Sequence, residues 1–367
     1  MRLPLTLLAA LLLATPALAQ NEAEGDGVEG EAVEGEAVDP AEPPPTPRQL
    51  KKALKQLQGK EWALASLSLH TVLEDPEAAY FHADIRYYLA YCLEQMGMSY
   101  SALEEYNRFL ESADPASNLA EKAIERSVSV ARRMEAGWII APGLARLDTS
   151  AVKEGDRGPA MYWVGKHHYE QGNYAAARAF LSLVPKGTEF YANARMLEGV
   201  TLTREQKPVE AIAPLAAAVN ASKNDTDQTV SRVANMNLGR AYYALGNFER
   251  AVEHFEGIPR GSQQWFESLY EASWAYFRLG RFSGSLAHLQ TVDSPFFDGV
   301  YHPDATLLRI LIFYYLCKYI DGQTMLNDFT AEHRPIEEAL DKAIQRADAK
   351  PEELFEALYE WKVHRKD

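Results

Sequence analysis

The sequence is poor in the residue patterns that build catalytic and metal sites. It has only two cysteines, and its nine histidines form neither an HExxH motif nor a zinc-binding spacing with them. It also lacks a G-x-S-x-G elbow, a phosphate-binding Walker loop and a dinucleotide fingerprint. His167 and His168 are adjacent, so their rings diverge on a helix, and we expect His168 to pack in or beside the core. We therefore predict that the chain is not an enzyme and binds no metal or cofactor.

Basic residues are missing between Gln20 and Pro47, where nine residues are acidic. Repelling charges with almost no apolar surface to bury keep such a segment disordered, and the prolines at 43–47 stiffen its end. The segment holds more than half of the formal net charge of −15. The rest of the chain is only mildly acidic, which makes nucleic acid a poor candidate partner. We expect residues 20–47 to be a solvated acidic and proline-rich tail.

A membrane-spanning run is missing from the N-terminus, because the apolar stretch Leu3–Ala14 is too short to cross a bilayer. Met1-Arg2 precedes this stretch and Ala17-Leu18-Ala19 follows it, as in a secretory signal with its cleavage site. No cysteine follows that site to carry a lipid. We predict that residues 1–19 are removed and that the mature protein is periplasmic or outer-membrane-associated, without a transmembrane segment. An uncleaved membrane anchor is the alternative.

Strand patterns are absent after residue 48, where apolar residues recur at helical spacing. The most regular stretch, residues 238–259, reads LGRAYYALGNFERAVEHFEGIP. Its small residues Gly239 and Ala251 would let two helices cross closely, with Phe255 filling the space beside them. Gly246 suits a left-handed residue that ends the first helix, and Pro259 stops the second. The stretch resembles a tetratricopeptide repeat, a unit of two antiparallel helices that recurs every 34 residues or so.

The same pattern recurs in phase along the chain. The following unit carries Ser273, Tyr276, Gly280, Phe282, Ser285, Leu289 and Val292 at the matching positions. Two preceding units carry Gly165, His168, Gly172, Tyr174, Ala177, Leu181 and Val184, and then Gly199, Leu202, Ala211, Leu215 and Ala218. The resemblance implies an all-α fold, a right-handed superhelical solenoid of about eight helix pairs. Each repeat in such a stack buries its apolar faces against its neighbours.

We predict that the solenoid spans residues 48–336 and that residues 337–367 form C-terminal capping helices. Residues 119–150 fit the pattern poorly, and we expect a degenerate repeat whose turn is disturbed by Gly137, Pro142 and Gly143. Cys92 and Cys317 fall in distant repeats, too far apart for the close approach of about 7 Å that a disulfide needs. We expect both to be buried, unpaired thiols.

The resemblance also implies a binding surface, because the first helix of each tetratricopeptide unit lines a concave groove. Aromatic residues dominate the groove positions, and four basic residues add positive charge. Such side chains carry much of the binding energy at protein interfaces. The predicted groove residues are Tyr87, Tyr91, Tyr162, Lys166, Tyr169, Met196, Arg204, Met236, Arg240, Tyr243, Tyr270, Trp274, Phe277, Arg278, Leu311, Tyr314 and Tyr315. We expect a partner segment with apolar and acidic residues, for which the acidic tail competes weakly; packing between repeats is the alternative for single residues.

A narrower resemblance lies between residues 294 and 319. It comprises Ser294-Pro295-Phe296-Phe297, then Tyr301-His302-Pro303-Asp304-Ala305, and a helix that ends in Cys317-Lys318-Tyr319. This segment, together with the signal and the acidic tail, resembles exported tetratricopeptide proteins of the myxobacterial adventurous gliding-motility machinery. That resemblance implies a scaffold in a multiprotein envelope complex.

Two functions remain open from the sequence. The first is a non-catalytic scaffold that joins envelope proteins, with gliding motility as the process. The alternative is a periplasmic assembly factor or chaperone-like protein that binds envelope or outer-membrane clients transiently. Both functions need protein partners rather than small-molecule substrates, and peripheral association with the outer membrane would come through those partners.

Overall fold

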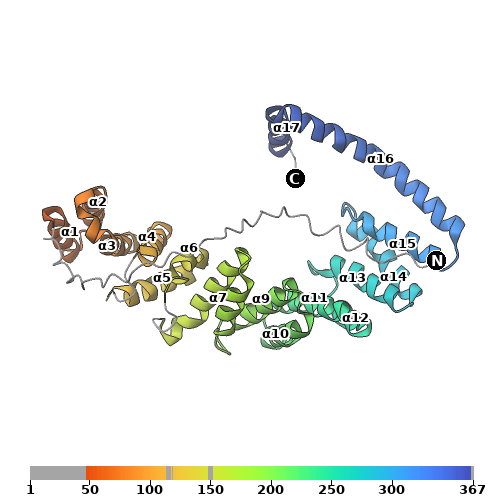
Figure 1. The fold of residues 1–367 in the computed structure, drawn as a ribbon, viewed down its shortest axis with the longest axis horizontal. Coiled ribbons are helices and arrows are strands. Elements are labelled where there is room, and N and C mark those ends of the chain that lie inside the picture. Colours follow the sequence, from red (N-terminus) through yellow and green to blue (C-terminus); the bar gives the residue numbers. More distant parts are fainter. Residues whose placement is uncertain (1–46, 113–116, 118, 148–151, 365–367) are drawn as a thin grey trace, which may run out of the picture. The chain divides into compact units, whose positions relative to one another are not determined.

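The structure is a computed structural model that describes residues 47–112, 117, 119–147 and 152–364. The predicted signal and nearly all of the acidic tail lie outside these residues. In the described part of the chain the regular structure is helical, and no strand occurs (Figure 1). This confirms the prediction of an all-α fold.

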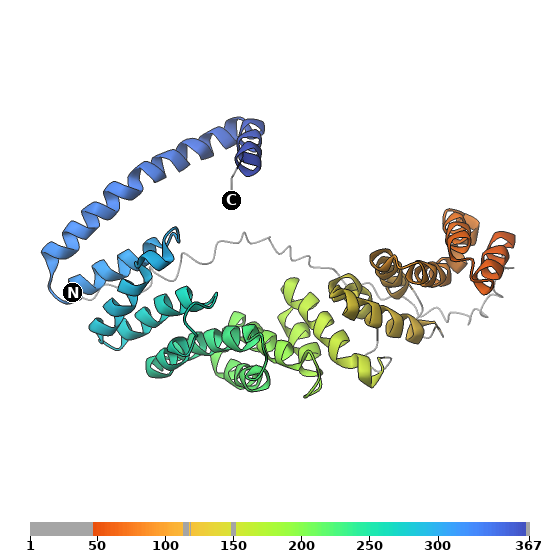
Figure 2. The same cartoon turned by 180° about the vertical axis from the view of Figure 1, so that it is seen from behind.

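Eight helix pairs follow one another along the chain. The first four are α1 (Arg48–Gln58) with α2 (Trp62–Leu73), α3 (His82–Gln95) with α4 (Ser99–Ser112), α5 (Ala120–Met134) with α6 (Gly137–Leu144), and α7 (Glu154–Glu170) with α8 (Tyr174–Ser182). The next four are α9 (Tyr191–Arg204) with α10 (Pro208–Ser222), α11 (Thr229–Ala244) with α12 (Phe248–Glu256), α13 (Trp265–Arg278) with α14 (Phe282–Val292), and α15 (Pro303–Tyr315) with α16 (Tyr319–Ala349). We call the first helix of each pair its A helix and the second its B helix. Each B helix packs against its own A helix, and neighbouring pairs lie side by side (Figures 1 and 2).

Each of the eight turns within a pair contains one residue with a positive backbone φ, which reverses the chain. Glycine holds this position in four turns, at residues 97, 172, 246 and 280, with φ between 70° and 77°. Lys60, Glu135, Gln206 and Cys317 hold it in the other four. The left-handed conformation costs glycine no steric strain, whereas a residue with a Cβ is strained there.

The crossing of the two helices in a pair depends on a glycine of the A helix. A Cβ placed on Gly239 would lie 2.4 Å from a ring carbon of Phe255, and a Cβ on Gly199 would lie 2.4 Å from Leu215. Gly165 meets Leu181 in the same way. These distances confirm that the recurring glycine and the large residue opposite it are complementary in size.

The poorly matching region is a helix pair with a short, unusual B helix. Gly137 and Gly143 lie within α6 and not in the turn before it, which corrects the prediction that they disturb the turn. A Cβ on Gly143 would lie 2.7 Å from Leu110 of α4, and the Gly143 amide donates a 2.9 Å hydrogen bond to the Asn107 side chain. The glycines therefore serve close contacts between helices.

The C-terminal helices differ in two ways from the prediction. The boundary expected at residue 336 falls inside α16, which continues through Pro335 to Ala349 before α17 (Pro351–His364) begins. Several apolar side chains of this region are exposed: Ile336, Leu340, Ile344, Phe355, Leu358 and Tyr359.

Cys317 is exposed and not buried as predicted, because it occupies the left-handed turn before α16. Among the described residues, no helix has an apolar stretch long enough to cross a membrane.

The connection between α14 and α15, which carries the narrower resemblance, packs on the start of α13. It contains the short 3₁₀ helix η4 (Pro295–Phe297). The Phe297 ring lies 5.0 Å from both Trp265 and Phe266, measured between ring centroids. The His302 ring lies 4.1 Å from the Tyr270 ring, again measured between ring centroids. The aromatic residues of this segment therefore join two neighbouring repeats.

Candidate functional site

The predicted groove residues all lie on A helices, from α3 to α15. We call the surface that they form the A-helix face. Their exposure differs widely along the chain. Met236 is only 2% exposed and packs in the core with Ala251 and Phe255, so it offers no surface, which corrects that part of the prediction. Tyr314 and Tyr315, at the other extreme, are 64% and 58% exposed.

The N-terminal part of the A-helix face contains a cavity of about 590 Å³ between α1, α3 and α5, which we call the N-terminal cavity. It is lined by Leu57, Tyr87, Tyr88, Tyr91, Glu94, Leu119, Lys122, Glu125, Arg126 and Ser129. Two of these, Tyr87 and Tyr91, are predicted groove residues. Tyr87 is only 7% exposed and packs in the core against Tyr106 and Phe109, which corrects the prediction for Tyr87. Arg126 was not predicted, and its guanidinium lies over the Tyr91 ring at 4.3 Å from the ring centre.

A part-buried hydrogen-bond network orients Arg126 in this cavity. Its guanidinium donates to both carboxylate oxygens of Glu94, at 3.0 and 3.1 Å, and the Tyr106 hydroxyl donates to Glu94 at 2.8 Å. Burial raises the pKa of Tyr106 far above its ordinary value, and the Glu94 carboxylate raises it further. Tyr106 therefore stays a hydrogen-bond donor at any physiological pH, and the network fixes the cationic wall of the cavity.

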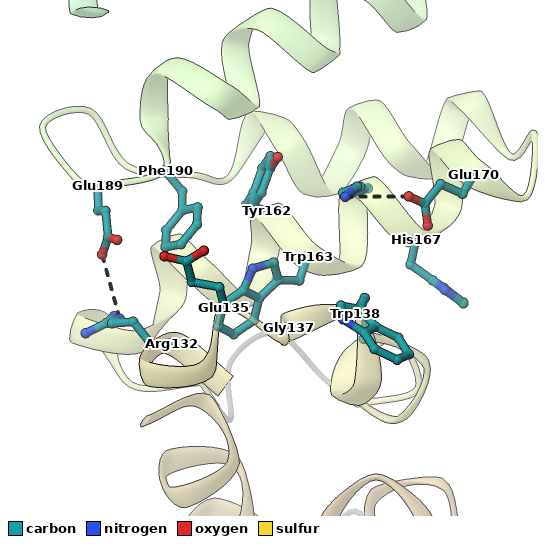
Figure 3. A pocket seen from close by; sticks show the side chains of 12 residues that line it. Arg132, Glu135, Gly137, Trp138, Tyr162, Trp163, His167, Glu170, Glu189 and Phe190 are labelled. Carbon is teal, nitrogen blue, oxygen red and sulfur yellow. Dashed lines mark ion pairs between the residues drawn. The ribbon is translucent and has the colours of Figure 1, made fainter. Parts of the chain in front are cut away.

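A second pocket, of about 320 Å³, lies where α5, α6, α7 and the start of α9 meet; we call it the central pocket (Figure 3). It is lined by Arg132, Glu135, Gly137, Trp138, Ala141, Tyr162, Trp163, Lys166, His167, Glu170, Glu189 and Phe190. Tyr162 and Lys166 are the predicted groove residues among them. The sequence reasoning missed Trp138, Trp163 and Phe190. The close-packed Gly137 was the one signal that could have found Trp163.

Aromatic side chains form the floor of the central pocket. The Tyr162 and Phe190 rings are stacked at 5.2 Å between centroids, and Trp163 meets Phe190 edge to face at 5.6 Å. The Trp163 indole lies directly against Gly137, where a Cβ would come within 2.0 Å of the ring. Trp138, by contrast, is 67% exposed at the pocket mouth. The floor is thus rigid and the mouth offers an open indole.

Charged groups of both signs line the same pocket. Lys166 Nζ lies 3.7 Å from a Glu170 oxygen, and Arg132 Nε lies 3.9 Å from a Glu189 oxygen. Arg132 also donates a 3.2 Å hydrogen bond to the Gly155 carbonyl, which directs its guanidinium away from the floor. Among the ion pairs of the described residues none involves Glu135. Its side chain points toward the Trp163 and Phe190 rings (Figure 3).

The predicted cations farther along the chain serve the stack itself. Arg240 on α11 donates from Nε to both carboxylate oxygens of Glu271 on α13, at 2.9 and 3.0 Å, and from an Nη to Glu267 at 2.8 Å. Burial raises the pKa of Glu271 above its ordinary value, and the bonds from Arg240 oppose that rise. Arg240 therefore joins two repeats and is not a spare positive charge for an acidic partner, which corrects that expectation.

An aromatic cluster follows, built from Tyr243, Phe248, Trp274, Phe277, Phe282 and Tyr315; we call it the C-terminal aromatic cluster. The Arg278 guanidinium lies 4.5 Å from the centre of the Phe248 ring. Phe277 contacts Tyr315 edge to face at 5.3 Å, which carries the cluster from α13 to α15. Arg278 is thus held by aromatic faces within the stack.

Four further predicted residues lie outside these features. Tyr169 on α7 is half-buried and contacts the Tyr174 ring at 5.8 Å. Arg204, the last residue of α9, is exposed, whereas Met196 on the same helix packs against the core. Leu311 also packs against the core. These positions add little open surface apart from Arg204.

Side chains able to hold a metal are scattered in the part of the chain that the structure describes, where no group of three or more histidine, cysteine or acidic residues converges. His168 stacks on Phe180 at 5.3 Å, and burial lowers its pKa, as expected for a residue at the core boundary. Burial raises the pKa of the Cys92 thiol to about 11. Cys92 is therefore a protonated, inert thiol at neutral pH.

Comparison with protein families gives one match, the tetratricopeptide repeat, over residues 233–257. These residues belong to α11 and α12, the pair whose sequence is the most regular. The match confirms that this segment is a tetratricopeptide repeat. The other seven pairs described above share its left-handed turn residue, and α7–α8 and α9–α10 also share its crossing glycine. No curated protein matches the sequence.

Solved structures with tetratricopeptide repeats resemble the chain weakly. The C-terminal part of a tetratricopeptide repeat-containing protein from Cytophaga hutchinsonii is 14% identical, with 66% of this chain and 93% of that chain covered and a TM-score of 0.40. A tetratricopeptide repeat protein from Parabacteroides merdae is 12% identical, with 77% and 91% covered and a TM-score of 0.33. The apo form of RapI is 12% identical, with 86% and 96% covered and a TM-score of 0.43. Likeness at this level supports no conclusion about function.

Proposed function

We propose that this protein is a non-catalytic scaffold that binds a segment of a partner protein along its A-helix face. One observation carries the proposal: aromatic side chains on the A helices α3 and α7, among them Tyr91 and Tyr162, line open cavities of about 590 and 320 Å³. Large, rigid side chains at a concave surface bury much apolar area with little loss of conformational entropy. Two such cavities, one with aromatic residues from α3 and the other with aromatic residues from α7, suit an extended or helical segment.

We further propose that the partner belongs to the cell envelope and that the process is gliding motility or a related envelope function. The support comes from the sequence: the secretory signal in residues 1–19, the acidic tail, and the segment between residues 294 and 319 that resembles the myxobacterial gliding proteins. In the structure, Phe297 of that segment, which lies in the α14–α15 connection, packs against Trp265 and Phe266 at the start of α13.

Site-specific photocrosslinking in cells tests the scaffold proposal. A photoreactive phenylalanine replaces Tyr91, Tyr169 or Tyr314 on the A-helix face, and Tyr100 on the B helix α4 serves as the matched control. Tyr100 is exposed and is also a tyrosine, so it controls for reactivity and for size. We expect a small, constant set of envelope proteins to be crosslinked from the A-helix positions and not from Tyr100.

Two results would count against this proposal. Crosslinks that come mainly from Tyr100 would place binding on the B helices. A large and variable set of weakly occupied clients would support the assembly factor or chaperone-like function instead.

A further inference from the structure

The central pocket has an unbalanced charge above an aromatic floor. Its two basic side chains, Arg132 and Lys166, are engaged with Glu189 and Glu170. Glu135 is the remaining carboxylate of the pocket, and it is directed at the aromatic rings and not at a cation (Figure 3). The Glu135 side chain is exposed at the pocket, and an unpaired carboxylate there gains a charge-assisted hydrogen bond from a guanidinium that enters the pocket.

Backbone strain at Glu135 points to the same residue. Its φ is 52°, in the left-handed region, at the turn where four other pairs use glycine. A residue with a Cβ costs about 1–2 kcal/mol in that conformation. Lys60, Gln206 and Cys317 have the same strain at three other turns, so the feature that distinguishes Glu135 is its place in the central pocket. At this turn the side chain retained in place of glycine is a carboxylate that faces a pocket.

We propose that the central pocket holds an arginine side chain of the bound partner, with its guanidinium paired with Glu135 and its flat face on the aromatic side chains. The proposal rests on the proposed function, since the arginine belongs to the segment bound along the A-helix face. Arginine suits the pocket better than lysine. Its guanidinium is planar and weakly hydrated, so it stacks on Trp138 or on the floor while it donates hydrogen bonds to a carboxylate.

The packing of Gly137 explains how the pocket keeps its shape. The Trp163 indole rests on the Gly137 backbone, so any side chain at 137 would push the indole out of its place. Phe190, the residue before α9, meets the indole edge to face, and Tyr162 in turn stacks on Phe190. The floor is therefore built before a ligand arrives, which reduces the entropy lost on binding.

A model peptide tests the proposal without the natural partner. The mature protein is labelled with 5-fluorotryptophan, and the ¹⁹F signals of Trp138 and Trp163 are assigned by substitution of each with Phe. The probe is acetyl-Gly-Arg-Gly-amide, and the same peptide with Lys, Gln or Glu in the middle serves as comparison. We expect the arginine peptide to shift the Trp138 and Trp163 signals saturably and more strongly than the lysine peptide.

Two variants separate a binding role of Glu135 from a structural one. Glu135→Gln keeps the shape of the side chain and should weaken binding of the arginine peptide by about tenfold, because a charge-assisted hydrogen bond is lost. Glu135→Gly should abolish binding while the thermal midpoint stays the same or rises, because glycine relieves the strained turn. Glu249→Gln, an exposed glutamate on α12, is the control and should change neither property.

Equal affinity of the arginine peptide for the native protein and for Glu135→Gln would overturn the proposal. Preference for the glutamate peptide would also overturn it and would make Lys166 and His167 the ligand-binding groups. If crosslinking from the A-helix face succeeds while no arginine peptide binds, the scaffold proposal stands and only the arginine inference fails.

Discussion

At the scale of single residues, size matters most where the two helices of a pair cross. Gly165, Gly199 and Gly239 each face a large apolar side chain at a distance that leaves no room for a Cβ. In the following pair, Ser273 takes the place of the glycine and Ser285 donates a 2.8 Å hydrogen bond to its carbonyl. The crossing thus tolerates one small polar pair because its hydroxyls find partners within the helices.

We predict that Gly239→Leu destabilises the protein by about 1–3 kcal/mol, because the added side chain collides with the Phe255 ring. Urea unfolding followed by circular dichroism measures the change. Glu249→Leu, on the exposed side of α12, is the matched control and should have little effect. Equal loss of stability in the two variants would contradict the close-crossing argument.

Glu198 predicts a pH dependence of stability. Burial raises its pKa, and the nearby Arg195 and Arg178 only partly oppose the rise. The folded chain then holds the Glu198 proton more tightly than the unfolded chain. Its contribution to stability is present below the unfolded pKa and is lost as the pH rises through the folded pKa. Glutamine does not ionise, so the Glu198→Gln variant does not lose this contribution. Its free energy of unfolding, minus that of the native protein, should therefore increase from about pH 4 to about pH 7. A difference that stays constant over this range would show that Glu198 has no raised pKa.

At the scale of the elements, the turns within the pairs are the most uniform part of the molecule. Each places one residue in the left-handed region, although only half of them use glycine. The reason is geometric: an A helix can reverse into its B helix over so few residues only if one residue has a positive φ. The four turns without glycine therefore destabilise the fold, because a residue with a Cβ is strained at a positive φ.

We predict that Gln206→Gly stabilises the protein by ~0.5–1 kcal/mol, because Gln206 has a φ of 60° and its side chain is exposed. Thermal unfolding of this variant measures the gain. Gly246→Ala, at the equivalent turn of the next pair, should lose stability for the converse reason. A gain from alanine at 246 would refute the strain argument.

At the scale of the whole molecule, ion pairs and aromatic contacts connect one repeat to the next. Arg126 with Glu94 joins α5 to α3, and Arg240 with Glu271 joins α11 to α13. Both pairs lie on the A-helix face, where the sequence predicts a partner. Part of that face therefore stabilises the stack, and the N-terminal cavity and the central pocket are what remains for binding.

Export is a property of the whole chain that its first residues predict. Residues 1–19 have the composition of a secretory signal, and the first residue after the expected cleavage is Gln20. The intact mass of protein recovered from the cell envelope should match a chain that starts at Gln20 and carries no lipid. Recovery of a chain that retains Met1 would show that the segment is not removed.

The sequence by itself determined the helix pairs and their turns, because these depend on residues close together in the chain. The helical spacing of apolar residues, the glycine of the turn and the glycine of the crossing all lie within a single repeat. The sequence also identified the A helices as the carriers of exposed aromatic residues such as Tyr314 and Tyr315.

Only the tertiary structure decided which of those residues are available to a partner. Arg240 meets Glu271 from 31 positions away, and Arg126 meets Glu94 from 32, so no local pattern reveals that these cations are engaged. The same holds for the contact of Gly137 with Trp163, which forms the floor of the central pocket. Spacing within a repeat fixes which face a side chain occupies, but its neighbours across the stack come from other repeats, and they determine whether its charge or its ring is already in use.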